Sequence, residues 1–305
     1  LPICGNTYYY QNHAMQKDTW INDGNGWYYM DGDGFAKKGW FTESGKRYYL
    51  DDGTGKMQYG WKDQDGKWYY LGSSGAASTG WVNDNGAWYF MDHDTAVMRT
   101  GWLDEGGKRF FLEDSGRMAT GWTNQDNKWY YLDGSGALAK GWIDADGSRY
   151  YSNSDGVMHT GWLQDGGHWY FMRGNGAMAT GWRDMDGSWY FFNQDGQMVT
   201  GWQSIDGIWY YFDGNGHMAT GITDVGGVKY YLDDQGRMAA NTEVTVDGVN
   251  YTADGSGALS LVEQLPAEGG EASNESPDSQ SSPDAGQSGT NDAPVITGVS
   301  GGPGV

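Results

Sequence analysis

A short pattern recurs about every 20 residues, and this repeat restricts the possible fold more than any other feature. Its first aromatic position holds Trp20, Trp40, Trp61, Trp81, Trp102, Trp122, Trp142, Trp162, Trp182, Trp202 and finally Ile222. Its second position, seven residues later, holds Trp27, Arg47, Trp68, Trp88, Arg109, Trp129, Arg149, Trp169, Trp189, Trp209 and Lys229. Because all 17 tryptophans lie at these two positions, the chain is predicted to stack many copies of one unit.

Each unit is predicted to form a β-hairpin followed by a linking loop. Segments such as Trp68-Tyr69-Tyr70-Leu71 are short, aromatic and bounded by Gly, Asp or Asn, which indicates strands. Pairs that supply the positive φ angles of tight hairpin turns precede these segments, and they are Asp65-Gly66, Asn85-Gly86, Asp146-Gly147, Asp186-Gly187 and Asp206-Gly207. A unit of this size cannot bury its own apolar face. The predicted fold class is therefore all-β, a repeat solenoid of stacked β-hairpins.

The repeat also divides the chain into segments. Residues 1–19 read as a truncated first repeat, so more sequence is expected upstream, and residues 20–241 form the hairpin array. The period gains one residue in Asp51–Gly55 and one in Asp92–Val97, both in linking loops, which tolerate insertions. Residues 242–261 are a degenerate capping repeat. Residues 262–305 contain seven acidic residues and no Lys, Arg or aromatic residue, so a disordered tail is predicted there.

The charge restricts the class of ligand. The formal net charge is -21, of which about -14 lies on residues 1–261. An acidic array argues against nucleic acid and other polyanions, because phosphate binding requires a basic face. It is compatible with a cationic ligand, although solubility alone also explains a large net charge. No apolar run reaches the length of a membrane span, and the single Cys4 excludes an intrachain disulfide.

The aromatic residues have two interpretations. Aromatic side chains at a fixed phase of a solenoid usually form its core. However, the second position alternates between Trp and Arg or Lys, and a core position would not accept Arg47, Arg109 or Arg149. The second position is therefore predicted to lie at an open surface. Two tryptophans of one hairpin and a tyrosine of the next can surround a small space, and such a cage attracts a quaternary ammonium group.

The pattern Met-Ala-Thr-Gly-Trp followed by Asp-Gly-x-Trp-Tyr-Tyr resembles the choline-binding, or cell-wall-binding, repeats of Gram-positive surface proteins and phage lysins. The resemblance covers about residues 5–259. It implies a left-handed superhelix of β-hairpins. It also implies that choline binds between consecutive hairpins, against two tryptophans of one repeat and a tyrosine, often with a Met, of the next. Related repeats in glucan-binding domains and large toxins recognise carbohydrate, so a carbohydrate ligand is the alternative.

Transferred residue by residue, the resemblance implies seven cages. They consist of Trp20, Trp27 and Tyr48; Trp61, Trp68 and Tyr89; Trp81, Trp88 and Phe110; Trp122, Trp129 and Tyr150; Trp162, Trp169 and Tyr190; Trp182, Trp189 and Tyr210; and Trp202, Trp209 and Tyr230. The positions of Trp40, Trp102 and Trp142 meet an arginine instead. A guanidinium repels a cationic ligand and can itself stack on the tryptophan, so these positions are predicted to be closed.

No other arrangement of residues indicates catalysis or metal binding. Sequences such as Asp63-x-Asp65-Gly66 begin like a calcium loop, but no glutamate completes the pattern. The five histidines lie at different phases of the repeat, and no catalytic arrangement recurs with them. We therefore predict a non-catalytic module without cofactor or metal, secreted and held at a bacterial cell surface or cell wall. Its predicted partners are the choline groups of teichoic or lipoteichoic acid, with a choline-linked dimer also compatible. The alternatives are a glucan or glycan ligand and a passive spacer.

Overall fold

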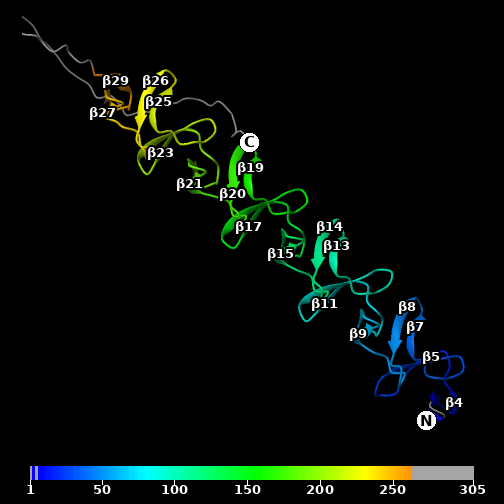
Figure 1. Cartoon of the computed structure of the whole chain (residues 1–305). Helices are drawn as coiled ribbons and strands as arrows, with labels where there is room; N and C mark the ends of the chain where they lie inside the picture. Colours follow the sequence, from blue (N-terminus) through cyan, green and yellow to red (C-terminus); the bar gives the residue numbers. More distant parts are fainter. Residues whose placement is uncertain (1, 4–5, 263–305) are drawn as a thin grey trace, which may run out of the picture. The chain divides into compact units, whose positions relative to one another are not determined.

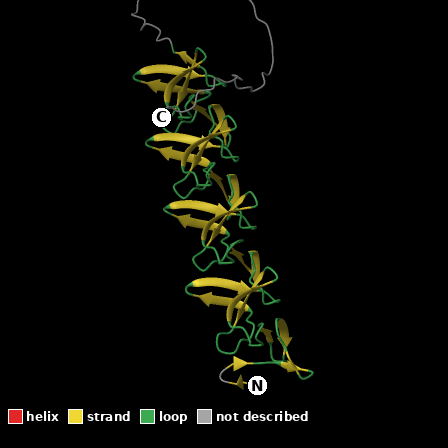
Figure 2. Cartoon of the chain, turned by 90° about the vertical axis from the view of Figure 1, so that its right-hand side faces the viewer, coloured by secondary structure: helices red, strands yellow, loops and turns green. Residues whose placement is uncertain are grey.

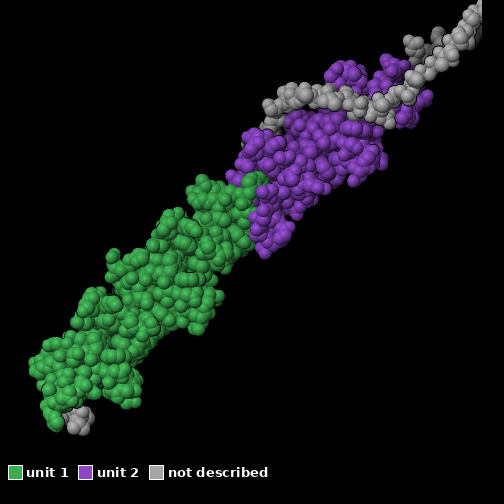
Figure 3. All heavy atoms as spheres, turned by 180° about the vertical axis from the view of Figure 1, so that it is seen from behind, with its two compact units in different colours: residues 1–143, 152–158 green, residues 144–151, 159–305 purple. Residues whose placement is uncertain are grey.

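The computed structural model describes residues 2–3 and 6–262, and these residues form β-hairpins and loops without a helix. Contacts divide the chain into two compact units, residues 1–143 with 152–158 and residues 144–151 with 159–305 (Figure 3). Within each unit the hairpins follow one another in chain order and point in different directions around the line of the stack (Figures 1 and 2). The all-β hairpin repeat is thus confirmed. The segment predicted to be a disordered tail lies, apart from Val262, outside the described residues.

Most hairpins consist of two strands of five residues. The first unit contains β1 (Pro2–Ile3), β2 (Asn6–Thr7), β3 (Tyr10–Gln11), β4 (Ala14–Met15), β5 (Thr19–Asn22), β6 (Trp27–Met30), β7 (Gly39–Glu43), β8 (Lys46–Leu50), β9 (Gly60–Gln64), β10 (Lys67–Leu71), β11 (Gly80–Asp84), β12 (Ala87–Met91), β13 (Gly101–Glu105), β14 (Lys108–Leu112), β15 (Gly121–Gln125) and β16 (Lys128–Leu132). The boundaries of the units fall in β17 (Gly141–Ala145), in β18 (Ser148–Ser152) and, after β18, between Met158 and His159.

The second unit continues the same alternation of strands and loops. It contains β19 (Gly161–Asp165), β20 (His168–Met172), β21 (Gly181–Met185), β22 (Ser188–Phe192), β23 (Gly201–Ile205), β24 (Ile208–Phe212), β25 (Gly221–Val225), β26 (Val228–Leu232), β27 (Thr242–Val246), β28 (Val249–Ala253) and β29 (Leu259–Leu261). The degenerate last repeat differs from the others because β29 adds a third antiparallel strand to β28. This strand covers an edge that would otherwise expose main-chain hydrogen-bonding groups.

The register of each hairpin follows from its two-residue turn. In β9 and β10, Trp61 lies opposite Tyr70 and Asp63 lies opposite Trp68. The turn between them has positive φ angles at both Asp65 (55°) and Gly66 (74°), as a tight hairpin turn requires. Alternate residues of a strand share a face, so both tryptophans project from the same face of the hairpin. The predicted turns and hairpins are confirmed.

The most deeply buried side chains are aliphatic and aromatic residues of the second strands, and residues of first strands such as Val82 and Leu103 add to the core. One such residue per hairpin is at most 1% exposed, and these residues are Met30, Leu50, Leu71, Met91, Leu112, Leu132, Met172, Phe192, Phe212 and Leu232. Ser152 is the equivalent buried residue of β18. Burial of a Leu, Met or Phe side chain stabilises a fold by about 1.5–3 kcal/mol. Stability is therefore distributed along the array, and first-position tryptophans such as Trp20, Trp81 and Trp162 pack against the buried residues.

The linking loops join consecutive repeats through the main chain. The amide N–H of Met98 donates to the carbonyl of Trp68 at 2.8 Å, and Met118 donates to Trp88 at 2.7 Å. The same bond recurs in later repeats, for example from Met198 to the carbonyl of Trp169 at 2.7 Å. The donor always belongs to the loop that follows the next hairpin. A hairpin is thus fixed to the repeat after it by a bond that does not depend on the side chain at the second position.

The loop methionines also pack against the following loop. The Met98 side chain lies so close to Gly116, which has a φ of 82°, that a Cβ atom at this glycine would overlap the Met98 sulfur. The same contact joins Met178 to Gly196 and Met218 to Gly236. Where a methionine packs against this loop position, glycine provides both the left-handed conformation and the space that the methionine occupies.

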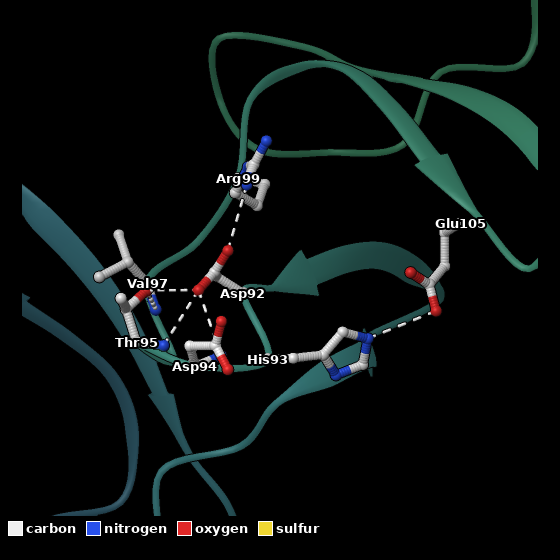
Figure 4. Close-up of polar contacts among 7 residues, drawn as sticks. All are labelled: Asp92, His93, Asp94, Thr95, Val97, Arg99 and Glu105. Atoms are coloured by element: carbon white, nitrogen blue, oxygen red, sulfur yellow. Dashed lines mark hydrogen bonds and ion pairs between the residues drawn. The ribbon is translucent and has the colours of Figure 1, made fainter.

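Both longer loops accommodate the extra residue in the same way. Asp92 accepts hydrogen bonds from the amide and the hydroxyl of Thr95 at 3.0 and 2.8 Å, and Arg99 pairs with its other oxygen at 3.1 Å (Figure 4). The amide of Ala96 then donates to the carbonyl of Asp92, four residues back, whereas shorter loops close over three residues. Asp51 and Thr54 repeat this arrangement in the other longer loop. The insertions remain in the loops, as predicted.

The Thr95 hydroxyl and amide, together with Arg99, lower the pKa of Asp92 to about 2 from its ordinary value of 3.8. A carboxyl whose pKa is lower in the folded state stabilises the fold above the unfolded pKa, and this contribution is lost as the pH falls through the folded pKa. Thr95→Val should therefore lower the Tm near pH 6, and the difference from the wild type should shrink as the pH falls from about 4 to about 2. Thr120→Val, at an exposed threonine of a shorter loop, is the control. A Tm difference that does not change with pH would contradict this explanation.

The contact between Met98 and Gly116 can be tested with a second glycine of similar conformation. Gly116→Ala combines a strained φ with a steric overlap, whereas Gly121→Ala, at a φ of 76° with no atom within 4 Å of the added Cβ, introduces only the strain. We expect Gly116→Ala to be more destabilising than Gly121→Ala by about 1–3 kcal/mol in chemical unfolding. Equal losses of stability would show that the Met98 side chain moves aside without a measurable loss of unfolding free energy.

Candidate functional site

The rings around Trp61 show how consecutive hairpins form one candidate cage. Trp61 of β9 and Trp68 of β10 meet edge to face with ring centroids 6.3 Å apart, and Tyr89 of β12 lies 4.7 Å from Trp61. The Trp61 indole N–H donates to Asp84 of the next hairpin at 3.1 Å, which fixes the orientation of the ring. Trp68 is 44% exposed. The first tryptophan thus contributes to the joint between hairpins, and the second presents its ring to solvent.

Four more of the predicted sets have this geometry. The distance from the first tryptophan to the second tryptophan is similar in all of these sets, and so is the shorter distance from the first tryptophan to the ring of the next hairpin. The two distances are 6.4 and 4.9 Å for Trp81 with Trp88 and Phe110, 6.1 and 5.2 Å for Trp162 with Trp169 and Tyr190, 6.3 and 4.8 Å for Trp182 with Trp189 and Tyr210, and 6.4 and 4.7 Å for Trp202 with Trp209 and Tyr230. Phe110 is therefore placed like the tyrosines.

The set at Trp20 encloses a defined hollow. The rings of Trp20 and Tyr48 are 4.9 Å apart, and Trp20, Trp27 and Tyr48 line a hollow of about 420 Å³ together with Met57. This volume lies within the range of small-molecule sites. The methionine is thus one wall of the site, and its own amide donates to the carbonyl of Trp27 at 2.8 Å.

The remaining predicted set is divided between the two units. Trp122 and Trp129 belong to the first unit and Tyr150 to the second. Trp129 is 45% exposed, like the other second-position tryptophans. The cage formed by these three residues stays a prediction.

Arginine fills the corresponding space in two other repeats. The Arg47 guanidinium lies over the Trp40 ring, 4.2 Å from its centroid, and 5.5 Å from that of Tyr69. Arg109 lies over Trp102 at 4.8 Å. These contacts agree with the predicted stacking of arginine on tryptophan. Trp142 and Arg149 belong to different units, and Arg149 forms an ion pair with Asp144 at 3.4 Å.

Two of the cage tyrosines, Tyr190 and Tyr230, have a pKa raised above the ordinary value of 10.0. Burial, together with the charges of Asp213 and Asp186, raises the pKa of Tyr190, and burial with Asp254 raises that of Tyr230. Tyr190 is only 7% exposed, and His217 from a later loop packs edge-on against it at 5.2 Å. A neutral, electron-rich ring suits a cationic ligand. The sequence analysis did not predict the histidine contact, since His217 lies outside the recurring aromatic positions.

The described part of the chain has neither a metal-ligand cluster nor a membrane-spanning helix. Residues 2–3 and 6–262 contain no group of three His, Cys, Asp or Glu residues that could hold a metal ion. The same residues include no helix long and apolar enough to cross a membrane. The recurring aromatic cage is the candidate site.

This combination of repeated β-hairpins and aromatic cages defines a class of repeat binding modules. A family model described as a choline-binding repeat matches residues 99–140, 139–180 and 179–221. A second, described as a cell wall binding repeat, matches residues 18–34, 38–57, 60–77, 79–94 and 222–238. The chain belongs to the family of choline-binding, or cell-wall-binding, repeats.

Solved structures support this assignment. CbpJ from Streptococcus pneumoniae is 30% identical, with a TM-score of 0.59 over 79% of this chain and 99% of CbpJ. Choline binding protein F from the same species, in the presence of a peptidoglycan analogue, is 30% identical, with a TM-score of 0.57 over 85% of this chain and 100% of that chain. The modular autolysin LytC is 26% identical, with a TM-score of 0.51 over 70% of this chain and 52% of LytC. No curated protein matches the chain.

Proposed function

We propose that the chain attaches a protein to choline-decorated polymers of a bacterial cell wall, through aromatic cages between consecutive hairpins. The observation that carries this proposal is the recurring set of two tryptophans and one ring of the next hairpin, with centroid distances that vary by only a few tenths of an ångström. Membership of the choline-binding repeat family supports it. The role is binding rather than catalysis.

The cage has the chemistry that a trimethylammonium group requires. Such a group has no N–H to donate, so it is recognised by the negative faces of aromatic rings, each good contact contributing about 0.5–2 kcal/mol. The methionine sulfur adds a polarizable apolar wall. Arg47 supports this assignment from within the chain, because its guanidinium occupies the space between Trp40 and Tyr69 that a ligand cation would fill. The proposed sites are the cages without arginine.

The array, rather than a single cage, is the proposed functional unit. Three rings and a methionine should hold free choline only weakly, with a Kd on the order of millimolar. A polymer that presents many choline groups would engage several cages together, and the effective concentration of the later groups raises the overall affinity by about 10²- to 10⁴-fold. The acidic character of the array favours the same cationic groups over the phosphates of the polymer. We therefore place the protein at the cell wall or cell surface, with teichoic or lipoteichoic acid as its partner.

Retention on a quaternary-amine resin that mimics choline tests the proposed ligand. The chain should bind this resin at physiological salt, where simple ion exchange is weakened, and free choline at roughly tenfold the millimolar Kd should elute it. Glucan oligosaccharides at the same concentration serve as the control and should not elute it. Retention on a glucan matrix alone would favour a carbohydrate ligand, and the absence of retention on both would leave a passive spacer.

The individual cages can be tested by counting bound choline. Trp189→Ala removes an exposed wall of the cage at Trp182 and should lower the stoichiometry in isothermal titration calorimetry by about one choline per chain. Arg109→Ala removes a side chain at the equivalent position, where the guanidinium already covers Trp102, and should leave the stoichiometry unchanged. If both substitutions removed one choline, the distinction between open and closed cages would be wrong.

A further inference from the structure

Tyr59 distinguishes one cage from the others. It lines the hollow formed by Trp20, Trp27, Tyr48 and Met57, and it is 47% exposed. A large aromatic side chain that lies half exposed beside an apolar hollow is able to bury more of its surface when a ligand enters. The repeat pattern did not single out Tyr59, because it lies at neither of the two aromatic positions.

The main chain directs Tyr59 toward the cage. The amide of Met57 donates to the carbonyl of Trp27 at 2.8 Å, and the amide of Gln58 donates to that of Tyr49 at 3.0 Å. These two bonds fix the segment immediately before Tyr59 between the two hairpins of the cage. In an extended segment alternate side chains project to the same side, so Tyr59 follows Met57 onto the side of the hollow.

The equivalent position in the other repeats has no aromatic residue. Two residues after the loop Met, Ala or Leu, the remaining repeats hold Lys38, Thr79, Thr100, Thr120, Lys140, Thr160, Thr180, Thr200, Thr220 and Ala240. The main-chain bonds are nevertheless the same, since Met218 and Ala219 donate to the carbonyls of Trp189 and Tyr211, both at 2.8 Å. The cages at Trp20 and Trp182 therefore have the same main-chain hydrogen bonds, but the cage at Trp20 has the additional ring of Tyr59.

We propose that Tyr59 is a fourth aromatic wall, and that the cage at Trp20 is the tightest quaternary-ammonium site of the array. The inference rests on the proposed function, because it assumes that the cages bind an ammonium group. A fourth ring adds a cation–π contact and excludes water from one more side of the ligand. Ser73 and Ser74 line the same hollow and offer polar groups to the hydroxyl end of choline. The first choline group captured by the chain would enter this cage.

Calorimetry with free choline tests the inference on the full chain. The wild type should show one site that binds about 2- to 30-fold more tightly than the remaining sites, as one additional cation–π contact implies. Tyr59→Thr, which installs the residue found in most repeats, should bring this site into the weaker class without changing the stoichiometry. Tyr59→Phe keeps the ring and should keep the tight site. The reciprocal variant Thr220→Tyr, at the cage of Trp182, should create a second tight site.

The possible failures of this experiment are distinct. If Tyr59→Thr binds choline like the wild type while Trp27→Ala loses one site, the cages bind choline but Tyr59 is not part of one. If the wild type binds no choline, the proposed function fails, and the inference fails with it. Thermal unfolding of each variant without ligand shows whether a lost site reflects a lost fold.

Discussion

The main-chain hydrogen bond between each hairpin and the loop of the following repeat is the interaction on which the rest of the structure depends. Its acceptor is the carbonyl of the second aromatic position, as in Trp27, Trp68 and Trp88, and its donor is the loop residue of the next repeat. Arg47 and Arg109 accept the same bond from Ala77 and Leu138. Because the bond requires only the backbone, the side chain at this position is free to change between Trp and Arg without loss of the joint. The backbone of this residue thus joins the repeats, and its side chain is left for the proposed recognition of a ligand.

The two tryptophans of a unit consequently have different roles. The first packs against its own hairpin and the next one, as Trp61 does with Tyr70 at 5.1 Å and Tyr89 at 4.7 Å. The second presents a face to solvent, as the exposed Trp68 and Trp189 do. An exposed indole at a recurrent position is costly to solubility unless it serves an interaction. Arginine at this second position has the opposite effect, because its guanidinium covers the first tryptophan with a cation that belongs to the chain itself.

Much of this organisation could be predicted from the sequence. The period, the Asp-Gly and Asn-Gly turns and the variability of the second position indicated the hairpins, their register and the exposed side chains. The packing of Met98 on Gly116 could not be predicted, because the period shows which residues are equivalent but not which repeats are in contact. Nor did the tryptophan pattern indicate that the most deeply buried side chains are those of residues such as Leu71 and Phe192. Tyr59 was missed for a similar reason, since a side chain that occurs at one repeat only has no periodicity.

Some hairpins, such as β21–β22, contribute to two cages, and this connects ligand binding to the stability of the array. Tyr190 of β22 packs against Trp162 of the preceding cage, whereas Trp182 and Trp189 of the same hairpin meet Tyr210 of the next. A ligand held at such a joint contacts both hairpins and binds only while they are stacked. At a free concentration ten times its Kd, one bound ligand stabilises the folded state by about 1.4 kcal/mol. In a repeat protein, where stability is a sum over neighbouring interfaces, several occupied joints add their contributions. A polymer bound in the proposed way would therefore also stabilise the stacking of the hairpins.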